Sequence, residues 1–150
     1  MNTHLRMETD PKALIALSVS PNEEDHLSLQ KSLLPAASAV YEADGPSAAL
    51  ATLRRYPVGV VLCERDLGPG TWIDVLELLH GLPDEPPLIV TSRLADETLW
   101  ADALNRGAYD VLAKPFDQQE LNRTVNLAWL RWYYRHDRPL RTAKVMTFAG

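Results

Sequence analysis

The sequence has a single cysteine, Cys63, among its 150 residues. One cysteine cannot form an intramolecular disulfide, which excludes the small secreted folds that such bonds hold together. Cys63 lies in an apolar stretch typical of a buried strand, and this position favours a structural thiol over a reactive one. The cysteine content therefore indicates a protein of a reducing cytoplasm.

Long hydrophobic runs are also missing. The apolar run Ala13–Leu17 is far too short to span a membrane, and no small-residue cleavage site follows a basic segment. We therefore expect neither export nor a role at a membrane. Repeats of fixed period and low-complexity tracts do not occur either.

An excess of positive charge is missing too. The chain has 15 Lys and Arg against 20 Asp and Glu, a formal net charge of -5, and its pI is about 5.3. This balance argues against a domain whose main role is to bind nucleic acid or an anionic membrane. The C-terminal end is locally basic, through Arg131, Arg135, Arg138, Arg141 and Lys144. We interpret these cations as a solvated face or linker, because no recognisable DNA-binding helix pair follows.

The length and hydrophobic content of the chain suit a single domain. With 46% hydrophobic residues, the chain can bury one core. Strand-like and helix-like segments alternate five times, which predicts an α/β fold with a doubly wound, five-stranded parallel sheet and helices on both faces. We place this domain at residues 12–135, between a flexible tail at 1–11 and a C-terminal extension at 136–150.

Apolar runs and turn signals locate the elements. The predicted strands are residues 13–19, 39–42, 58–62, 88–90 and 109–113. The predicted helices are residues 22–34, 47–55, 72–80, 95–106 and a long one from about 117. Asn22 and Ser47 are the predicted N-caps. The acids after Asn22 fit the positive end of the first helix, and we interpret them as capping residues; they are Glu23, Glu24 and Asp25.

The strand predicted at 58–62 is apolar throughout, interrupted by Gly59 alone. Such a strand fits the middle of a parallel sheet that is covered on both faces. Open sheets of this kind place their ligand sites at the carboxyl ends of the strands. The predicted topology brings four residues to that edge, namely Ser18, Glu64, Thr91 and Lys114. We therefore predict a functional site centred on Glu64.

Three segments resemble the receiver domain of bacterial two-component response regulators. They are Glu64–Leu76 (ERDLGPGTWIDVL), Ile89–Ser92 (IVTS) and Gly107–Phe116 (GAYDVLAKPF). The resemblance implies a flavodoxin-like fold and a signalling module rather than an enzyme. In that family a strand-end aspartate accepts a phosphoryl group and an acidic pair after the first strand binds Mg²⁺. A Thr or Ser contacts the phosphoryl group, and a Lys pairs with it.

The resemblance is partial at the site. Thr91 and Lys114 match the family's hydroxyl and lysine, whereas Glu64 occupies the phosphoacceptor position. Ser18 and Val19 face Glu64 where the family has acids, and Val111 occupies the position of the family's switch aromatic.

One glutamate and a serine offer too few oxygen ligands for Mg²⁺. Phosphoryl transfer without a metal loses its main electrostatic support. We interpret the chain as a degenerate receiver, or pseudo-receiver, that uses no metal and no cofactor. Glutamate is one methylene longer than aspartate, so Glu64 could mimic the phosphorylated state.

Several alternatives stay open. The pair of Glu64 and Lys114 could only tie two strand ends together. Asp66 could be a displaced phosphoacceptor, although capping of the following loop suits it better. The chain could also be a doubly wound enzyme or small-ligand-binding domain, but a dinucleotide site needs a glycine-rich turn after the first strand, and the segment SVSPNEED has no glycine.

The resemblance also implies a protein partner, which could be a kinase, an output protein or a second copy of the chain. Receivers commonly dimerise or signal through their fourth and fifth helices. The candidate partner surface is Trp129, Trp132 and Tyr133 on the last predicted helix, with core packing as the alternative for Trp129. Direct binding of nucleic acid is not expected, so any DNA-related role would have to come from the partner.

Overall fold

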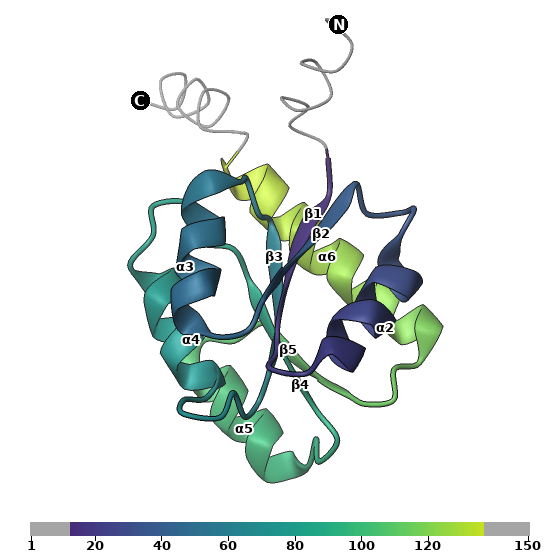
Figure 1. Ribbon diagram of the computed structural model, residues 1–150, viewed down its shortest axis with the longest axis vertical. Helices are drawn as coiled ribbons and strands as arrows, with labels where there is room; N and C mark the ends of the chain where they lie inside the picture. Colours follow the sequence, from purple (N-terminus) through teal and green to yellow (C-terminus); the bar gives the residue numbers. More distant parts are fainter. Residues whose placement is uncertain (1–12, 137–150) are drawn as a thin grey trace, which may run out of the picture.

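A parallel, five-stranded sheet forms the middle layer of this computed structural model, which describes residues 13–136 (Figure 1). The strands are β1 (Ile15–Val19), β2 (Ala39–Ala43), β3 (Val60–Glu64), β4 (Leu88–Ser92) and β5 (Asp110–Ala113). Their spatial order is β2-β1-β3-β4-β5. The tail predicted at 1–11 and residues 137–150 of the predicted extension lie outside the described residues.

Helices cover both faces of the sheet (Figure 1). One face carries α2 (Glu23–Leu33) and α6 (Gln118–His136), and the other carries α3 (Pro46–Arg55), α4 (Trp72–His80) and α5 (Glu97–Arg106). The predicted fold class, an α/β fold with a doubly wound, five-stranded parallel sheet and helices on both faces, is confirmed. Within residues 13–136, none of the helices has the length and apolar character needed to cross a membrane.

The central strand β3 contributes to both cores, as its apolar sequence predicts. Val61 and Cys63 point to the core under α3, α4 and α5. Val60 and Leu62 point to the core under α2 and α6. Successive side chains of a strand point to opposite faces of the sheet, so a strand that is buried on both faces must be apolar at every position. Burial also raises the pKa of the Cys63 thiol, which keeps this cysteine protonated and unreactive.

Helix starts and stops follow local chemistry. Thr71 and Asp74 form a reciprocal capping box at the start of α4, and Asp117 accepts hydrogen bonds from the first N–H groups of α6. Ser47 was the predicted cap of the second helix, and this prediction is wrong. The helix begins one residue earlier, at Pro46, because proline lacks an N–H and its fixed φ suits the first turn.

The orientation of α5 differs from the sequence pattern. Trp100, Ala103 and Leu104 have helical spacing and predict a common apolar face. In the structure Leu99 and Ala103 are the buried residues of α5, while Trp100 is 51% exposed and Leu104 is 36% exposed. The helix is therefore rotated by about one residue relative to that pattern, which leaves two large apolar side chains on the surface.

Candidate functional site

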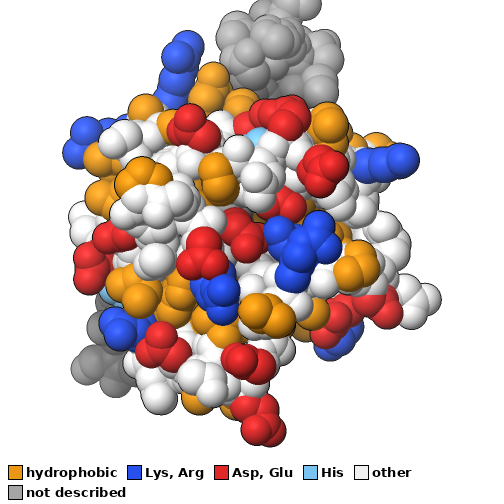
Figure 2. Space-filling model, turned by 60° about the horizontal axis from the view of Figure 1, so that its bottom comes forward, with side chains coloured by type: hydrophobic (Ala, Val, Ile, Leu, Met, Phe, Trp, Pro, Cys, Tyr) orange, Lys and Arg blue, Asp and Glu red, His pale blue; other side chains and the backbone are white. Residues whose placement is uncertain are grey.

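Three predicted site residues meet at the carboxyl ends of the strands. Glu64 is the last residue of β3 and lies opposite Thr91 on β4. Lys114 directly follows β5, and its N–H donates to the Ser92 carbonyl of β4 at 3.0 Å. Figure 2 brings the lower end of Figure 1 forward and shows acidic and basic side chains next to each other near the middle of that face. The predicted convergence at this edge therefore occurs for Glu64, Thr91 and Lys114.

Two carboxylates bind the Lys114 ammonium. Its Nζ is 2.5 Å from Glu64 Oε1 and 2.9 Å from Asp25 Oδ1. The side chains of Lys114, Glu64 and Asp25 are only 9%, 13% and 15% exposed. The Thr91 hydroxyl donates to Glu64 Oε1 at 3.4 Å, a long contact. The result is a nearly buried cluster in which one ammonium is shared between two carboxylates.

The cluster shifts the pKa values of two of its members. Burial disfavours the ionised form of Asp25, but hydrogen bonds from Ser20 and Lys114 and the charge of Lys114 outweigh it, and the pKa of Asp25 is lowered. Burial also disfavours the charged form of Lys114, but its contacts with Glu64 and Asp25 outweigh this effect and raise its pKa. Each contact therefore favours the charged forms of both residues.

Ser18 and Val19 are not members of the cluster around Lys114. The Ser18 hydroxyl hydrogen-bonds to Nδ1 of the buried His26 at 2.8 Å, and Val19 packs in the core under α3, α4 and α5. Ser20 is the residue at this end of β1 that reaches the cluster, because its hydroxyl donates to Asp25 Oδ2 at 2.6 Å. The expectation that Ser18 and Val19 face Glu64 is corrected accordingly.

Asp25 is the site residue that the sequence interpretation missed. It was assigned to helix capping with its two acidic neighbours, but it alone of the three points at Lys114. Glu23 and Glu24 are exposed, whereas Asp25 is partly buried. The sequence does contain a signal for Asp25. In an open parallel sheet, the first turn of a helix that directly follows a strand lies at the carboxyl ends of the strands, where ligands bind. The site therefore has two carboxylates rather than one.

Asp66 and Val111 are peripheral to the cluster. The Asp66 carboxylate accepts two hydrogen bonds from Arg65 and its side chain is 65% exposed. The helix that follows the loop is capped by Thr71 and Asp74. Val111 is partly buried and packs against the core under α3, α4 and α5. Its short aliphatic side chain leaves no aromatic group on β5 at the position of the family's switch residue.

The aromatic residues of α6 divide between the interior and the surface. Trp129 is 7% exposed and belongs to the core under α2 and α6, so the partner-surface interpretation fails for this residue. Trp132 and Tyr133 are partly buried and pack against the same core. Both indoles lie over Gly59, where an added Cβ would be 2.6 Å from Trp129 and 2.7 Å from Trp132.

The receiver resemblance implies a Mg²⁺ site, and the residues present do not fit one. Both carboxylates at this edge are held by the Lys114 ammonium, which places a positive charge between them. Within residues 13–136, no group of three or more His, Cys, Asp and Glu could hold a metal ion. A divalent cation at this edge would have to displace the Lys114 ammonium from both carboxylates.

Comparisons with known proteins concern the family and the fold of the chain. A family model described as the response regulator receiver domain matches residues 22–126. No curated protein matches the chain.

Solved structures share the fold. The signal receiver domain of an HD domain-containing protein from Pseudomonas fluorescens Pf-5 has a TM-score of 0.75 and 26% identity, with 85% of this chain and 94% of that chain covered. The signal receiver domain of a putative Luxo repressor protein from Vibrio parahaemolyticus has a TM-score of 0.74 and 16% identity, covering 82% and 95%. The N-terminal signal receiver domain of a two-component system response regulator from Bacteroides fragilis has a TM-score of 0.71 and 24% identity, covering 79% and 98%.

Proposed function

Since the chain belongs to the response regulator receiver family, we propose that it is a pseudo-receiver, which signals by binding a protein partner and does not depend on phosphorylation. The observation that carries the proposal is the double contact of the Lys114 ammonium with Glu64 and Asp25. Receiver domains are generally signalling modules rather than enzymes. The family match favours this proposal over the alternative of a doubly wound enzyme or small-ligand-binding domain.

The charges around Lys114 support a permanently activated-like state. In the family this lysine pairs with the phosphoryl group once it has been transferred. Here Glu64 already supplies a negative charge at the acceptor position, and Asp25 supplies a second one 2.9 Å from the ammonium. Two carboxylates approximate the charge of a phosphoryl group, which is about -1.5 to -2 at neutral pH. Lys114 is therefore satisfied without phosphate.

We propose that the partner binds at the fourth and fifth helices of the chain, α5 and α6. Trp100 and Leu104 support this surface, because they are four positions apart on α5 and are 51% and 36% exposed. Tyr134 on α6 is 50% exposed. Exposed apolar patches on a protein surface often mark sites of interaction with another protein. The partner would be a kinase, an output protein or a second copy of this chain.

The test compares partner affinity and stability in three variants. A partner purified by capture on the wild-type chain is titrated against Glu64→Gln, Glu64→Asp and Lys114→Ala. Glu64→Gln removes the charge, Glu64→Asp withdraws it by one methylene, and Lys114→Ala removes the cation. All three should weaken binding by the folded fraction. Loss of stability with unchanged affinity would show that the pair only holds strand ends together, and a phosphate adduct on Asp66 would replace the proposal with a phosphorylated receiver.

A further inference from the structure

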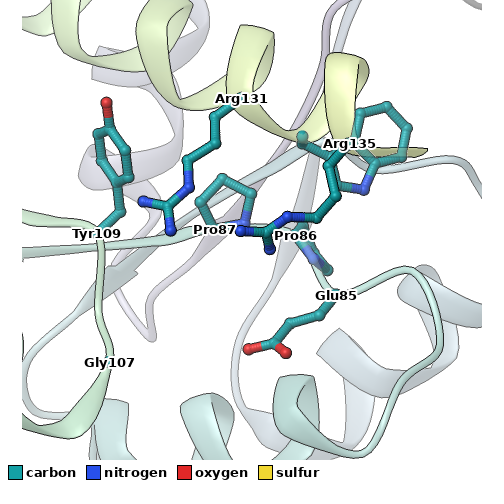
Figure 3. A pocket seen from close by; sticks show the side chains of 8 residues that line it. Glu85, Pro86, Pro87, Gly107, Tyr109, Arg131 and Arg135 are labelled. Carbon is teal, nitrogen blue, oxygen red and sulfur yellow. The ribbon is translucent and has the colours of Figure 1, made fainter. Parts of the chain in front are cut away.

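A basic hollow lies at the end of the sheet opposite Glu64. Pro87 directly precedes β4 and Tyr109 directly precedes β5, so both mark the amino ends of their strands, whereas Glu64 and Lys114 mark the carboxyl ends. Arg131 and Arg135 of α6 complete the hollow (Figure 3). The two guanidinium groups extend from α6 over Pro86 and Pro87 (Figure 3). The hollow is therefore separate from the cluster around Lys114.

The two arginines have no carboxylate partner among residues 13–136. Arg131 lies over the Tyr109 ring, with its guanidinium carbon 5.7 Å from the ring centroid. Arg135 forms no ion pair with any described residue. Tyr109 orients the Arg131 guanidinium by a cation–π contact but leaves its N–H donors available.

The one acid that lines the hollow, Glu85, has a different partner. Its carboxylate is 2.6 Å from Nδ1 of His80 at the end of α4. Figure 3 shows the Glu85 carboxylate turned away from the Arg131 guanidinium. Glu85 therefore forms no ion pair with either arginine, and among the lining residues two guanidinium charges face a single carboxylate.

From these observations we propose that the hollow binds an extended, acidic segment of a partner protein through its carboxylates. The hollow encloses about 50 Å³, which suits a carboxylate head group rather than a whole cofactor, since cofactor pockets measure about 300 Å³ or more. Guanidinium forks bind carboxylates with two parallel hydrogen bonds. Pro86 and Pro87 lack N–H groups and present flat apolar surface for the residues between the acids.

The spacing of the arginines favours alternate acids. Residues four apart on a helix are separated by about 6 Å along its axis. In an extended chain, residues two apart are separated by about 7 Å and point to the same side. Two acids with one residue between them can therefore each reach one guanidinium. Nucleic acid fits less well, because the chain as a whole carries a formal net charge of -5.

The experiment titrates the full chain with a short peptide that contains Glu-Val-Glu, and with a control peptide that contains Gln-Val-Gln. NMR signals of the Arg Nε–H groups and of the Trp132 indole report binding at constant ionic strength. The acidic peptide should shift these signals saturably, and the Gln peptide should not. Arg131→Gln and Arg135→Gln should each weaken binding about tenfold, the loss of one charge-assisted contact.

Arg123→Gln is the matched control, because it removes the same charge from an exposed position of the same helix. It should change the affinity by less than about twofold, as expected for a screened charge outside the hollow. All three variants are surface substitutions that should leave the far-UV spectrum intact. An equal effect of Arg123→Gln would overturn the proposal, and so would the absence of shifts at millimolar peptide. Tighter, arginine-dependent binding of inorganic phosphate or duplex DNA would assign the hollow to a phosphate ligand and would also refute it.

Discussion

Asp25 and Lys114 are 89 positions apart in the sequence, and their side chains meet at 2.9 Å. The contact joins the first turn of α2 to the end of β5, and Glu64 adds the end of β3 to the same ammonium. The cluster therefore links the beginning, the middle and the last third of the domain. Because its members are nearly buried, their charges interact more strongly than charges on the surface. Removal of the Lys114 ammonium leaves both carboxylates without a cation.

The first prediction concerns acid. The pKa of Asp25 in the folded protein is lowered from its ordinary value of 3.8, so its contribution to stability is present above that pH and is lost as the pH falls further through the folded value. Asp25→Asn should therefore lower the free energy of unfolding at pH 7, and the difference from wild type should shrink below about pH 4. Urea unfolding of both proteins across this range is the measurement.

Asp66→Asn is the control variant for the unfolding experiment at acidic pH, because the Asp66 side chain is 65% exposed and its pair with Arg65 lies on the surface. Its effect should stay within about 0.5 kcal/mol at all pH values. A constant difference between Asp25→Asn and wild type down to pH 2 would contradict the assignment of the charged pair.

At alkaline pH the Lys114 ammonium gives the opposite dependence. Its pKa is raised above its ordinary value of 10.5, so the stability that it contributes is complete below that pH and is lost as the pH rises through the pKa of Lys114 in the folded protein.

The second prediction concerns phosphorylation and metal. With Glu64 at the acceptor position and Lys114 already bound to two carboxylates, a small-molecule phosphodonor should leave the intact mass unchanged. Millimolar Mg²⁺ should cause no saturable amide shifts around Glu64 and Asp25. The metal experiment is a demanding test, because Asp25 adds a second carboxylate to the one that the sequence predicts at this site. A stoichiometric, hydroxylamine-labile adduct or saturable Mg²⁺ shifts would contradict the pseudo-receiver interpretation.

The fold could be predicted from the sequence because its signals are local. The inner strands β1, β3 and β4 are short, mostly apolar runs, and a strand that is apolar at every position requires cover on both faces. The residues at the strand ends followed from topology, since parallel strands bring their carboxyl ends to one edge. Glu64, Thr91 and Lys114 could be placed together in this way before any coordinates were known.

The rest of the site depends on side-chain direction, which the sequence pattern does not contain. Asp25 and Glu24 are neighbours in one acidic run, and only the rotation of α2 decides which of them faces Lys114. The same holds for α5, where Leu99 rather than Trp100 is buried. A helical repeat defines a stripe of apolar positions, but a wide stripe leaves the inward direction uncertain by about one residue, or 100°.

The third prediction concerns Gly59. A methyl group there would meet Trp129 at 2.6 Å and Trp132 at 2.7 Å, so both indoles would have to move. Gly59→Ala should lower the free energy of unfolding by about 1 to 3 kcal/mol, as overpacking of a core does. Gly81→Ala is the control, because the nearest atom to its added Cβ would be 3.5 Å away. Equal stabilities of the two variants would show that the indoles do not pack against β3.

The fourth prediction concerns association at α5. Trp100 is 51% exposed, so Trp100→Ala should cost less than about 1 kcal/mol of stability. If the residue anchors a partner or a second copy, the same change should weaken association by about 2 kcal/mol, as interface tryptophans do. Sedimentation measures self-association, and titration measures binding of a captured partner. Leu27→Ala, a change at a 55% exposed residue of α2, is the control, and an equal effect of both variants would contradict a specific surface at α5.

The fifth prediction concerns the coupling between Glu64 and Lys114. Lys114→Met removes the ammonium and leaves the carboxylates of Glu64 and Asp25 facing each other without a cation. We expect a loss of about 1 to 3 kcal/mol, less than the 3 to 5 kcal/mol of a fully buried pair. Glu64→Gln removes one carboxylate charge and keeps the shape of the side chain, so its cost should be smaller, because Asp25 still binds the ammonium.

The double variant decides whether the charges act together. After Lys114→Met, the change Glu64→Gln relieves the repulsion between two carboxylates, so the double variant should be more stable than the sum of the single changes by about 1 kcal/mol or more. Urea unfolding of the four proteins at pH 7 measures this coupling. Additivity within about 0.5 kcal/mol would mean that the 2.5 Å contact between Lys114 and Glu64 has no energetic weight. In that case a fixed charge at the acceptor position could not hold the domain in one state, and the proposed signalling mechanism would lose its physical basis.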